Sequence, residues 1–241
     1  MPRPAWLILP TYNESENLEA VIGAALPVLA AASPDGATIL VVDDNSPDGT
    51  GAIADRLAAA DDRIRVLHRP GKGGLGPAYL AGFAAALEGG AGYVLEMDSD
   101  FSHDPADLAR ILGAAQDGAD LALGSRYVRG GGITDWGPLR RFISAGGCWY
   151  ARAVLGLPVR DVTGGFKCFR RETLEGIDPS TIHSNGYAFQ VELTYRAVRN
   201  GARVVEVPII FRDREAGTSK MSWRIAAEAF WRVPLLRWQQ R

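Results

Sequence analysis

Two aspartates that flank one serine, Asp98-Ser99-Asp100, directly follow an apolar run over residues 93–97. Such a run predicts a buried strand, and the residues after it would lie in the crevice where open α/β sheets bind ligands. Two carboxylates this close repel each other unless a cation lies between them. A divalent cation can do this while it also binds a diphosphate. The segment therefore suggests a metal-dependent enzyme with a nucleotide-linked substrate; the alternative is a turn with two solvated aspartates.

Three further polar clusters follow predicted strands in the same way, at residues 10–14, 43–50 and 124–126. Right-handed crossovers place the carboxyl ends of successive parallel strands along one rim of a sheet. We therefore expect the four clusters to meet at one site rather than to be four unrelated surface loops.

The elements that must position these clusters alternate along the first half of the chain. Strands are predicted over 5–9, 38–42, 63–67, 93–97 and 120–124, and helices over 15–32 (capped by Ser15), 48–60, 75–87 and 105–116. This alternation indicates βαβ units and a largely parallel sheet. Later in the chain we predict helices over 138–155 and 187–199, strands over 161–169 and 203–211, and a terminal helix over 223–238, kinked at Pro234.

The composition is that of an ordinary globular protein, with 47% hydrophobic and 22% charged residues among 241. The formal net charge of −2 gives no electrostatic reason to expect nucleic acid as a partner. Cys148 and Cys168 are too few for a disulfide framework, and we expect them to be reduced and mostly buried in a cytoplasmic protein. No stretch reaches the roughly 18 apolar residues of a membrane span, so we expect a chain that can lie on a membrane without crossing it.

Asp43 and Asp44 end the second predicted strand. Neighbouring strand residues face opposite sides, so at most one of the two can point into the crevice while the other caps the following turn. A carboxylate that points inward there suits recognition of a base or a ribose. The alternative is an Asx-turn that leads into a helix, a role that Asp48 could fill equally well.

Basic residues lie in several loops. Lys72 belongs to a glycine-rich segment, 69–76, that opens a helix, where backbone amides could bind an anion; a plain tight turn is the alternative. Other basic residues could close over phosphates, or could be solvated surface charges. They are Arg126, Arg140, Arg141, Arg212, Arg214 and Lys220. The terminal segment mixes tryptophans with arginines, which suits either an amphipathic helix at a membrane interface or a helix docked on the domain.

Together these segments resemble glycosyltransferase family 2 and, within it, the dolichol and polyprenol phosphate mannosyltransferases. The matching motifs are Leu9-Pro10-Thr11-Tyr12-Asn13-Glu14, the segment from Val42 to Thr50, Gly74-Leu75-Gly76, the segment from Met97 to His103, Gly124-Ser125-Arg126-Tyr127, Thr163-Gly164-Gly165-Phe166, Gly186-Tyr187-Ala188-Phe189-Gln190 and Gly217-Thr218-Ser219-Lys220-Met221. They run in order over nearly the whole chain.

The resemblance implies a GT-A-type, Rossmann-like α/β fold in one domain, 1–241. Residues 5–127 would bind the nucleotide sugar, 128–221 would form the acceptor side, and 222–241 would be a terminal amphipathic helix. The implied activity is the inverting, metal-dependent transfer of mannose from GDP-mannose to a polyprenyl phosphate. The alternative within this fold is transfer of glucose or another sugar from a UDP- or GDP-sugar to the same lipid class.

The resemblance also implies roles for individual residues. Pro10, Tyr12, Glu14, Val42 and Asp44 match nucleoside-binding positions. Asp98 and Asp100 match the pair that binds Mg²⁺ or Mn²⁺, beside the backbone of Ser99. Arg126, Arg214 and Lys220 match phosphate-binding positions, and Arg140 or Arg141 resembles an arginine that binds the acceptor phosphate. Ser102 stands where some relatives carry a metal-binding glutamine, which argues against its being a ligand.

The lipid acceptor implies peripheral attachment to the cytoplasmic face of a membrane, and a membrane-embedded partner protein is a further expectation. Two other classes of protein are disfavoured. A dinucleotide-binding oxidoreductase would carry G-x-G-x-x-G, which is absent, and hydride transfer has no use for D-x-D. A non-catalytic nucleotide-sugar sensor would not need the full set of metal- and phosphate-binding residues.

Overall fold

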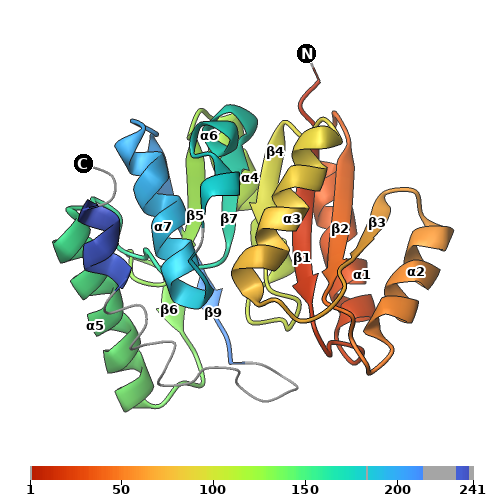
Figure 1. Ribbon diagram of the computed structural model, residues 1–241, viewed down its shortest axis with the longest axis horizontal. Helices are drawn as coiled ribbons and strands as arrows, with labels where there is room; N and C mark the ends of the chain where they lie inside the picture. Colours follow the sequence, from red (N-terminus) through yellow and green to blue (C-terminus); the bar gives the residue numbers. More distant parts are fainter. Residues whose placement is uncertain (1, 183, 214–231, 239–241) are drawn as a thin grey trace.

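A computed structural model describes residues 2–182, 184–213 and 232–238. Within these residues, seven strands form one twisted sheet in the order β3-β2-β1-β4-β7-β5-β8, with helices on both faces (Figure 1). The strands of this sheet are β1 Ala5–Thr11, β2 Ala37–Asp43, β3 Ile64–His68, β4 Tyr93–Glu96, β5 Leu121–Ser125, β7 Lys167–Arg170 and β8 Val204–Pro208. A second, two-stranded sheet pairs β6 Gly132–Ile133 with β9 Ile210–Phe211.

The helices divide between the two faces of the large sheet. One hydrophobic core lies under α1 Leu18–Ala32, α2 Thr50–Ala60 and α4 Leu108–Gln116, and the other lies under α3 Leu75–Glu88, α6 Arg171–Gly176 and α7 Gly186–Arg199. A third cluster joins α5 Pro138–Leu155 to α7 and to the short helix over 232–238. Two 3₁₀ helices, η1 Pro105–Asp107 and η2 Pro179–Thr181, complete the elements.

The predicted parallel α/β sheet is confirmed, with β7 as the exception. This strand runs antiparallel to both of its neighbours, β4 and β5. The strand predicted over 161–169 is correct only in its last residues, because residues 161–166 make other contacts. The Asp161 amide donates to the Glu206 carboxylate at 3.0 Å, and the Asp161 carboxylate binds Arg126.

Several predicted boundaries were wrong. Ser15 does not cap the first helix, which begins at Leu18, because the Ser15 amide instead donates to the Asp48 carboxylate at 3.1 Å. Asp48 also accepts hydrogen bonds from the amide and hydroxyl of Thr50, so the second helix begins two residues later than predicted. The strand predicted over 203–211 divides at Pro208 into β8 and β9, which belong to different sheets.

The terminal helix is described only over 232–238; the rest of the predicted segment lies outside the described residues. Val233 and Leu236 are buried in the cluster beside α5, whereas Leu235 and Trp238 are exposed. The described turns therefore have both a docked face and an exposed apolar face. Pro234 lies in the first of these turns, so the predicted kink is not tested.

Candidate active site

A cleft of about 470 Å³ opens at the carboxyl ends of β1, β2 and β4, between α3 and α7. Its lining residues come from both halves of the chain: Pro10, Thr11, Tyr12, Glu14, Asp44, Lys72, Gly74, Leu75, Ala78, Asp98, Ser99, Asp100, Thr163, Gly165, Asn185, Gly186, Tyr187 and Gln190. Three of the four polar clusters predicted to meet at one rim contribute to this cleft. The fourth, at 124–126, contributes none of the lining residues.

Eight of the predicted site residues line the cleft: Pro10, Tyr12, Glu14, Asp44, Lys72, Asp98, Ser99 and Asp100. Val42 does not, because the alternation of β2 directs its side chain into the core against α3, where it is fully buried. An ideal Cβ on Gly82 of α3 would lie 3.3 Å from this valine side chain. A nucleoside contact by Val42 stays a prediction.

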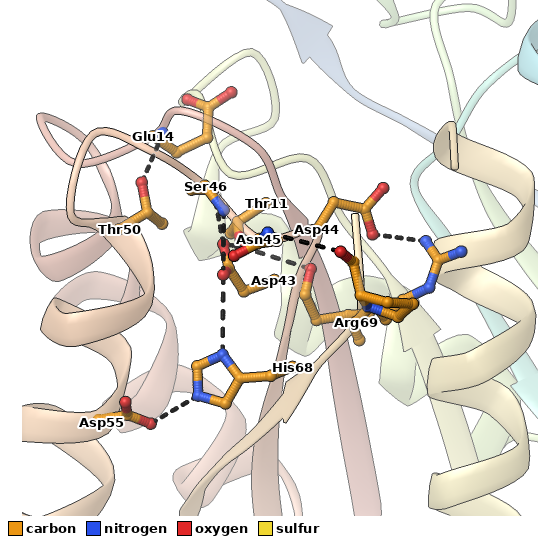
Figure 2. Close-up of polar contacts among 12 residues, drawn as sticks. Thr11, Glu14, Asp43, Asp44, Asn45, Ser46, Thr50, Asp55, His68 and Arg69 are labelled. Atoms are coloured by element: carbon orange, nitrogen blue, oxygen red, sulfur yellow. Dashed lines mark hydrogen bonds and ion pairs between the residues drawn. The ribbon is translucent and has the colours of Figure 1, made fainter. Parts of the chain in front are cut away.

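The two aspartates at the end of β2 face different ways, as strand geometry predicts (Figure 2). Asp43 accepts hydrogen bonds from the hydroxyl and amide of Ser46, at 2.6 and 3.3 Å, and so fixes the turn after the strand. Asp44 lines the cleft, where its carboxylate binds the Arg69 guanidinium and accepts the Gly73 amide at 3.0 Å. Arg69, the first residue after β3, was not predicted as part of the site.

The glycine-rich loop before α3 uses its amides to bind the protein itself. Gly73 donates to Asp44, and Gly76 donates to the Asn185 side chain at 3.1 Å. This favours the plain turn over a phosphate-binding loop. Lys72 nevertheless lies in the cleft, with its Nζ 4.1 Å from the centre of the Tyr12 ring.

Three hydrogen bonds fix the loop after β4 that carries Asp98 and Asp100. The Asp98 amide donates to Nδ1 of His103 at 3.3 Å, the Ser99 hydroxyl donates to the Pro10 carbonyl at 3.1 Å, and the Ser102 amide donates to Asp100 at 3.1 Å. Burial lowers the pKa of His103 to about 4. The imidazole is therefore neutral near pH 7 and accepts at Nδ1.

The donor set of this loop suits a hard divalent cation that shares its coordination with a substrate. Two carboxylates in one cleft are ligands that Mg²⁺ prefers, and Mg²⁺ commonly completes its shell with substrate phosphates and water. Among the residues that the structure describes, no cluster of three or more His, Cys, Asp or Glu side chains could hold a metal by itself. Metal binding by Asp98 and Asp100 stays a prediction.

Arg126 lies behind the cleft wall rather than in it. Its guanidinium makes two 2.7 Å hydrogen bonds to Asp161 and one of 2.9 Å to the Thr163 hydroxyl, and Thr163 lines the cleft. Burial would lower the pKa of Arg126, but the Asp161 carboxylate outweighs burial and raises it. Arg126 thus stays charged, and its contact with a phosphate stays a prediction.

Both predicted acceptor-side arginines lie on α5, away from the cleft lining. The Arg140 guanidinium binds Asp213 at 2.9 Å and stacks 4.0 Å from the centre of the Trp136 ring. Arg141 is exposed. Arg214 and Lys220 lie outside the described residues, so their phosphate-binding roles stay predictions.

The second half of the chain supplies a wall whose residues had been given no roles from sequence. Thr163, Asn185, Tyr187 and Gln190 are its polar members. Lys167 and Glu96 are both fully buried beside Gln190. Burial raises the pKa of Glu96, while the charge of Lys167 and the Gln190 amide act to lower it; burial lowers the pKa of Lys167, against the charge of Glu96. A glutamate in an otherwise apolar strand was the available signal.

Comparison with known proteins identifies the family. The family model described as "Glycosyl transferase family 2" matches residues 6–177. The chain is 51% identical over 228 residues to the polyprenol monophosphomannose synthase of Mycolicibacterium smegmatis, covering 94% of this chain and 84% of that protein. It is 49% identical over 231 residues to the undecaprenyl-phosphate mannosyltransferase of Micrococcus luteus, covering 96% and 92%. The chain belongs to glycosyltransferase family 2, and the protein is a glycosyltransferase.

Solved structures share the GT-A-like fold. Glucosyl-3-phosphoglycerate synthase from Mycobacterium tuberculosis, in complex with phosphoglyceric acid, superposes with a TM-score of 0.69 at 18% identity, covering 97% of this chain and 80% of that one. The same enzyme in complex with Mn²⁺, UDP-glucose and phosphoglyceric acid gives a TM-score of 0.65 at 21% identity, covering 96% and 80%. Mannosyl-3-phosphoglycerate synthase from Rubrobacter xylanophilus gives 0.65 at 17% identity, covering 99% and 74%.

Proposed function

We propose that this glycosyltransferase transfers mannose from GDP-mannose to a polyprenyl phosphate, with inversion at the sugar and with Mg²⁺ or Mn²⁺ bound by Asp98 and Asp100. The observation that carries the proposal is the placement of these carboxylates and Asp44 in one cleft. The names of the two relatives, which are about half identical over nearly the whole chain, support the sugar and the acceptor.

The cleft supports a division between the two ends of a nucleotide sugar. Asp44, held by Arg69 and the Gly73 amide, marks the nucleoside end at β2. Asp98 and Asp100 mark the diphosphate end at β4, where a bound divalent ion would neutralise charge on the GDP leaving group. The transferred hexose would then lie toward the wall formed by residues of α7 and the loop before β7.

The acceptor reduces what the protein must supply. A phosphate monoester is already an anion at neutral pH, so no strong general base is required. The protein's contribution would be alignment of the phosphate oxygen with the sugar C1 and neutralisation of charge. Arg140 and Arg141 on α5 are the arginines proposed to bind the acceptor phosphate.

The exterior of α5 supports attachment to a lipid surface. Leu139, Phe142, Ile143 and Trp149 lie on one face of this helix, and each is between 54% and 76% exposed. Exposed apolar and aromatic side chains beside arginines are typical of helices that lie in a membrane interface. No helix among the described residues is long and apolar enough to cross a bilayer. We propose peripheral association with the cytoplasmic face, where a membrane-embedded partner could also bind.

This attachment can be tested by vesicle sedimentation. Phe142→Glu and Trp149→Glu should release the protein from vesicles that contain anionic lipid, because each places a charge on the apolar face. Trp238→Glu is the matched change on the terminal helix, where the side chain is 80% exposed. Release by the Trp238 change alone would move the attachment from α5 to the terminal helix.

The alternative donor remains a UDP- or GDP-linked glucose or another hexose, because the Asp44 carboxylate in the cleft is an acceptor, and both bases carry N–H donors that it could bind. A transfer assay decides between them. Purified protein would be incubated with polyprenyl phosphate and a panel of radiolabelled nucleotide sugars, with Mg²⁺, Mn²⁺ or EDTA, and label would be counted in the lipid phase. Metal-dependent label from GDP-mannose alone is the expected result, and lipid label from none of the donors would overturn the proposal.

A further inference from the structure

The wall opposite the aspartates contains an amide whose orientation is fixed from behind. Gln190 lies in the second turn of α7, is only 2% exposed and lines the cleft. Behind it, Nζ of the fully buried Lys167 donates to the Gln190 side-chain oxygen, Oε1, and to the Gln190 carbonyl at 2.9 Å.

Lys167 fixes the orientation of the Gln190 carboxamide. An ammonium group has three donors and no acceptor, so it can bind only the oxygen of a carboxamide. Because Oε1 is held by Lys167, the amide nitrogen, Nε2, must point in the other direction. This resolves the ambiguity between oxygen and nitrogen that a carboxamide otherwise leaves.

The charge of Lys167 is balanced across the sheet. Glu96 on β4 pairs with Lys167 on β7 in the antiparallel register, and both side chains are fully buried. Neither Glu96 oxygen makes a hydrogen bond of good geometry, although the Gln190 amide lies close enough to lower the pKa of this carboxyl. Burying a pair of charges is costly, and such pairs are often no more stable than apolar replacements. Stability alone therefore does not explain why this pair is buried here.

The amide nitrogen lies near the diphosphate end of the cleft. An ideal Cβ on Gly165 would lie 3.4 Å from Nε2 of Gln190 and 3.9 Å from Oδ1 of Asp98. Gly165 has no such atom, so no side chain stands between the amide and Asp98, and all three residues line the cleft. Nε2 itself is buried and makes no hydrogen bond of good geometry, although the amide acts on the nearby Glu96 carboxyl. A buried donor left without an acceptor costs roughly 1–3 kcal/mol, so a bound acceptor there gains that amount.

We propose that Gln190 is a specificity-determining residue, whose Nε2 donates a hydrogen bond to a hydroxyl oxygen of the transferred hexose, and that Lys167 is the positioning residue that orients it. The inference rests on the proposed function, because it places the sugar beside the proposed metal site. A phosphate oxygen of the nucleotide offers the same acceptor chemistry, so the test must separate the sugar from the nucleotide.

Titration calorimetry in the presence of Mg²⁺ makes this separation by comparing GDP-mannose with GDP. Gln190→Met keeps the length of the side chain and removes the donor. We expect this variant to bind GDP-mannose about 10-fold more weakly, as for one lost hydrogen bond, and to bind GDP with unchanged affinity. An equal loss of affinity for both ligands would mean that the amide binds the phosphates, and this would overturn the proposal. Unchanged affinity for both ligands would overturn it as well.

The role of Lys167 needs a variant that leaves no buried charge unpaired. The double variant Glu96→Gln/Lys167→Met removes the whole pair, so the Gln190 amide can rotate. We expect a roughly threefold loss of GDP-mannose affinity, with GDP unaffected, because the amide then presents its nitrogen only part of the time. If the ratio of GDP-mannose affinity to GDP affinity in the double variant equals that of the wild type, Lys167 does not position the amide.

Thr194→Val supplies the matched control. Its hydroxyl donates to the Gln190 carbonyl at 3.0 Å, so the change removes a hydrogen bond to the same residue without touching its amide. Both affinities should stay at the wild-type values. If the wild type prefers another donor, such as UDP-glucose, the comparison is made between that donor and its own nucleoside diphosphate. If the wild type binds no nucleotide sugar at all, the proposed function and this inference fail together.

Discussion

The two walls of the cleft differ in where their charged groups lie. The acidic wall, Asp44, Asp98 and Asp100, turns carboxylates toward the cleft. The neutral wall, Thr163, Asn185, Tyr187 and Gln190, presents hydroxyl, amide and phenol groups, and its charges lie behind it. Arg126 donates to the Thr163 hydroxyl and Lys167 donates to the Gln190 amide. Charged groups facing the cleft suit a cation and a diphosphate, whereas oriented neutral groups suit sugar hydroxyls.

The buried ion pair behind Thr163 should give the largest stability effect. Asp161→Asn leaves the Arg126 guanidinium buried without its counter-charge, and we expect a loss of about 3–5 kcal/mol in the free energy of unfolding. Chemical denaturation measures this loss. Asp117→Asn, at an exposed site outside the cleft lining, is the control.

A second variant separates the charge from the packing at this site. Arg126→Met/Asp161→Asn leaves neither charge buried, so it should recover part of the stability lost in Asp161→Asn. A single-variant loss below about 1 kcal/mol would show that the pair behind the neutral wall is not needed to hold it.

The acidic wall should respond through ligand affinity instead. Asp44→Asn weakens the pairing with Arg69 and removes the charge at the proposed nucleoside end, and we expect about a 10-fold loss in GDP affinity. Fluorescence or calorimetric titration with GDP provides the measurement. Unchanged affinity would exclude Asp44 from the nucleoside site, and an equal loss in Asp117→Asn would show that the effect is not local.

We expect the smallest effect in the pH dependence of the free energy of unfolding. It comes from His68, which lies behind the turn at Asp43 (Figure 2). A hydrogen bond to Asp55 and the charges of Asp55 and Asp43 raise the pKa of His68, against some burial. A raised pKa means that this stabilisation is complete below pH 6.5 and is lost as the pH rises through the folded-state value. The ring is half exposed, so we expect less than about 1 kcal/mol. Chemical denaturation of His68→Gln at a series of pH values should no longer show this loss of stability with rising pH. A curve of stability against pH identical to that of the wild type would contradict the prediction.

Much of the acidic wall could be predicted from sequence because strand periodicity is local. The run over 93–97 locates the loop of Asp98 and Asp100, and the two-residue period of β2 separates Asp43 from Asp44. The largely parallel sheet follows from the alternation of strands and helices, whereas its GT-A type was implied by the family resemblance.

The neutral wall could not be predicted in the same way because it depends on pairing between distant segments. The match between Lys167 and Glu96 exists only because β7 inserts antiparallel beside β4, which no local pattern indicates. The location of Arg126 behind Thr163 likewise depends on Asp161. Arg140 and Arg141 were placed correctly on a helix, 138–155, but sequence does not show that this helix lies outside the cleft lining.

The central claim is that Asp98 and Asp100 hold a divalent cation together with the donor diphosphate. The most direct test measures GDP affinity with and without Mn²⁺ in the wild type and in Asp100→Asn, which preserves side-chain size and an acceptor for the Ser102 amide. We predict that Mn²⁺ strengthens GDP binding in the wild type at least about 10-fold and that this gain disappears in Asp100→Asn. A gain of the same size in both proteins would contradict the account.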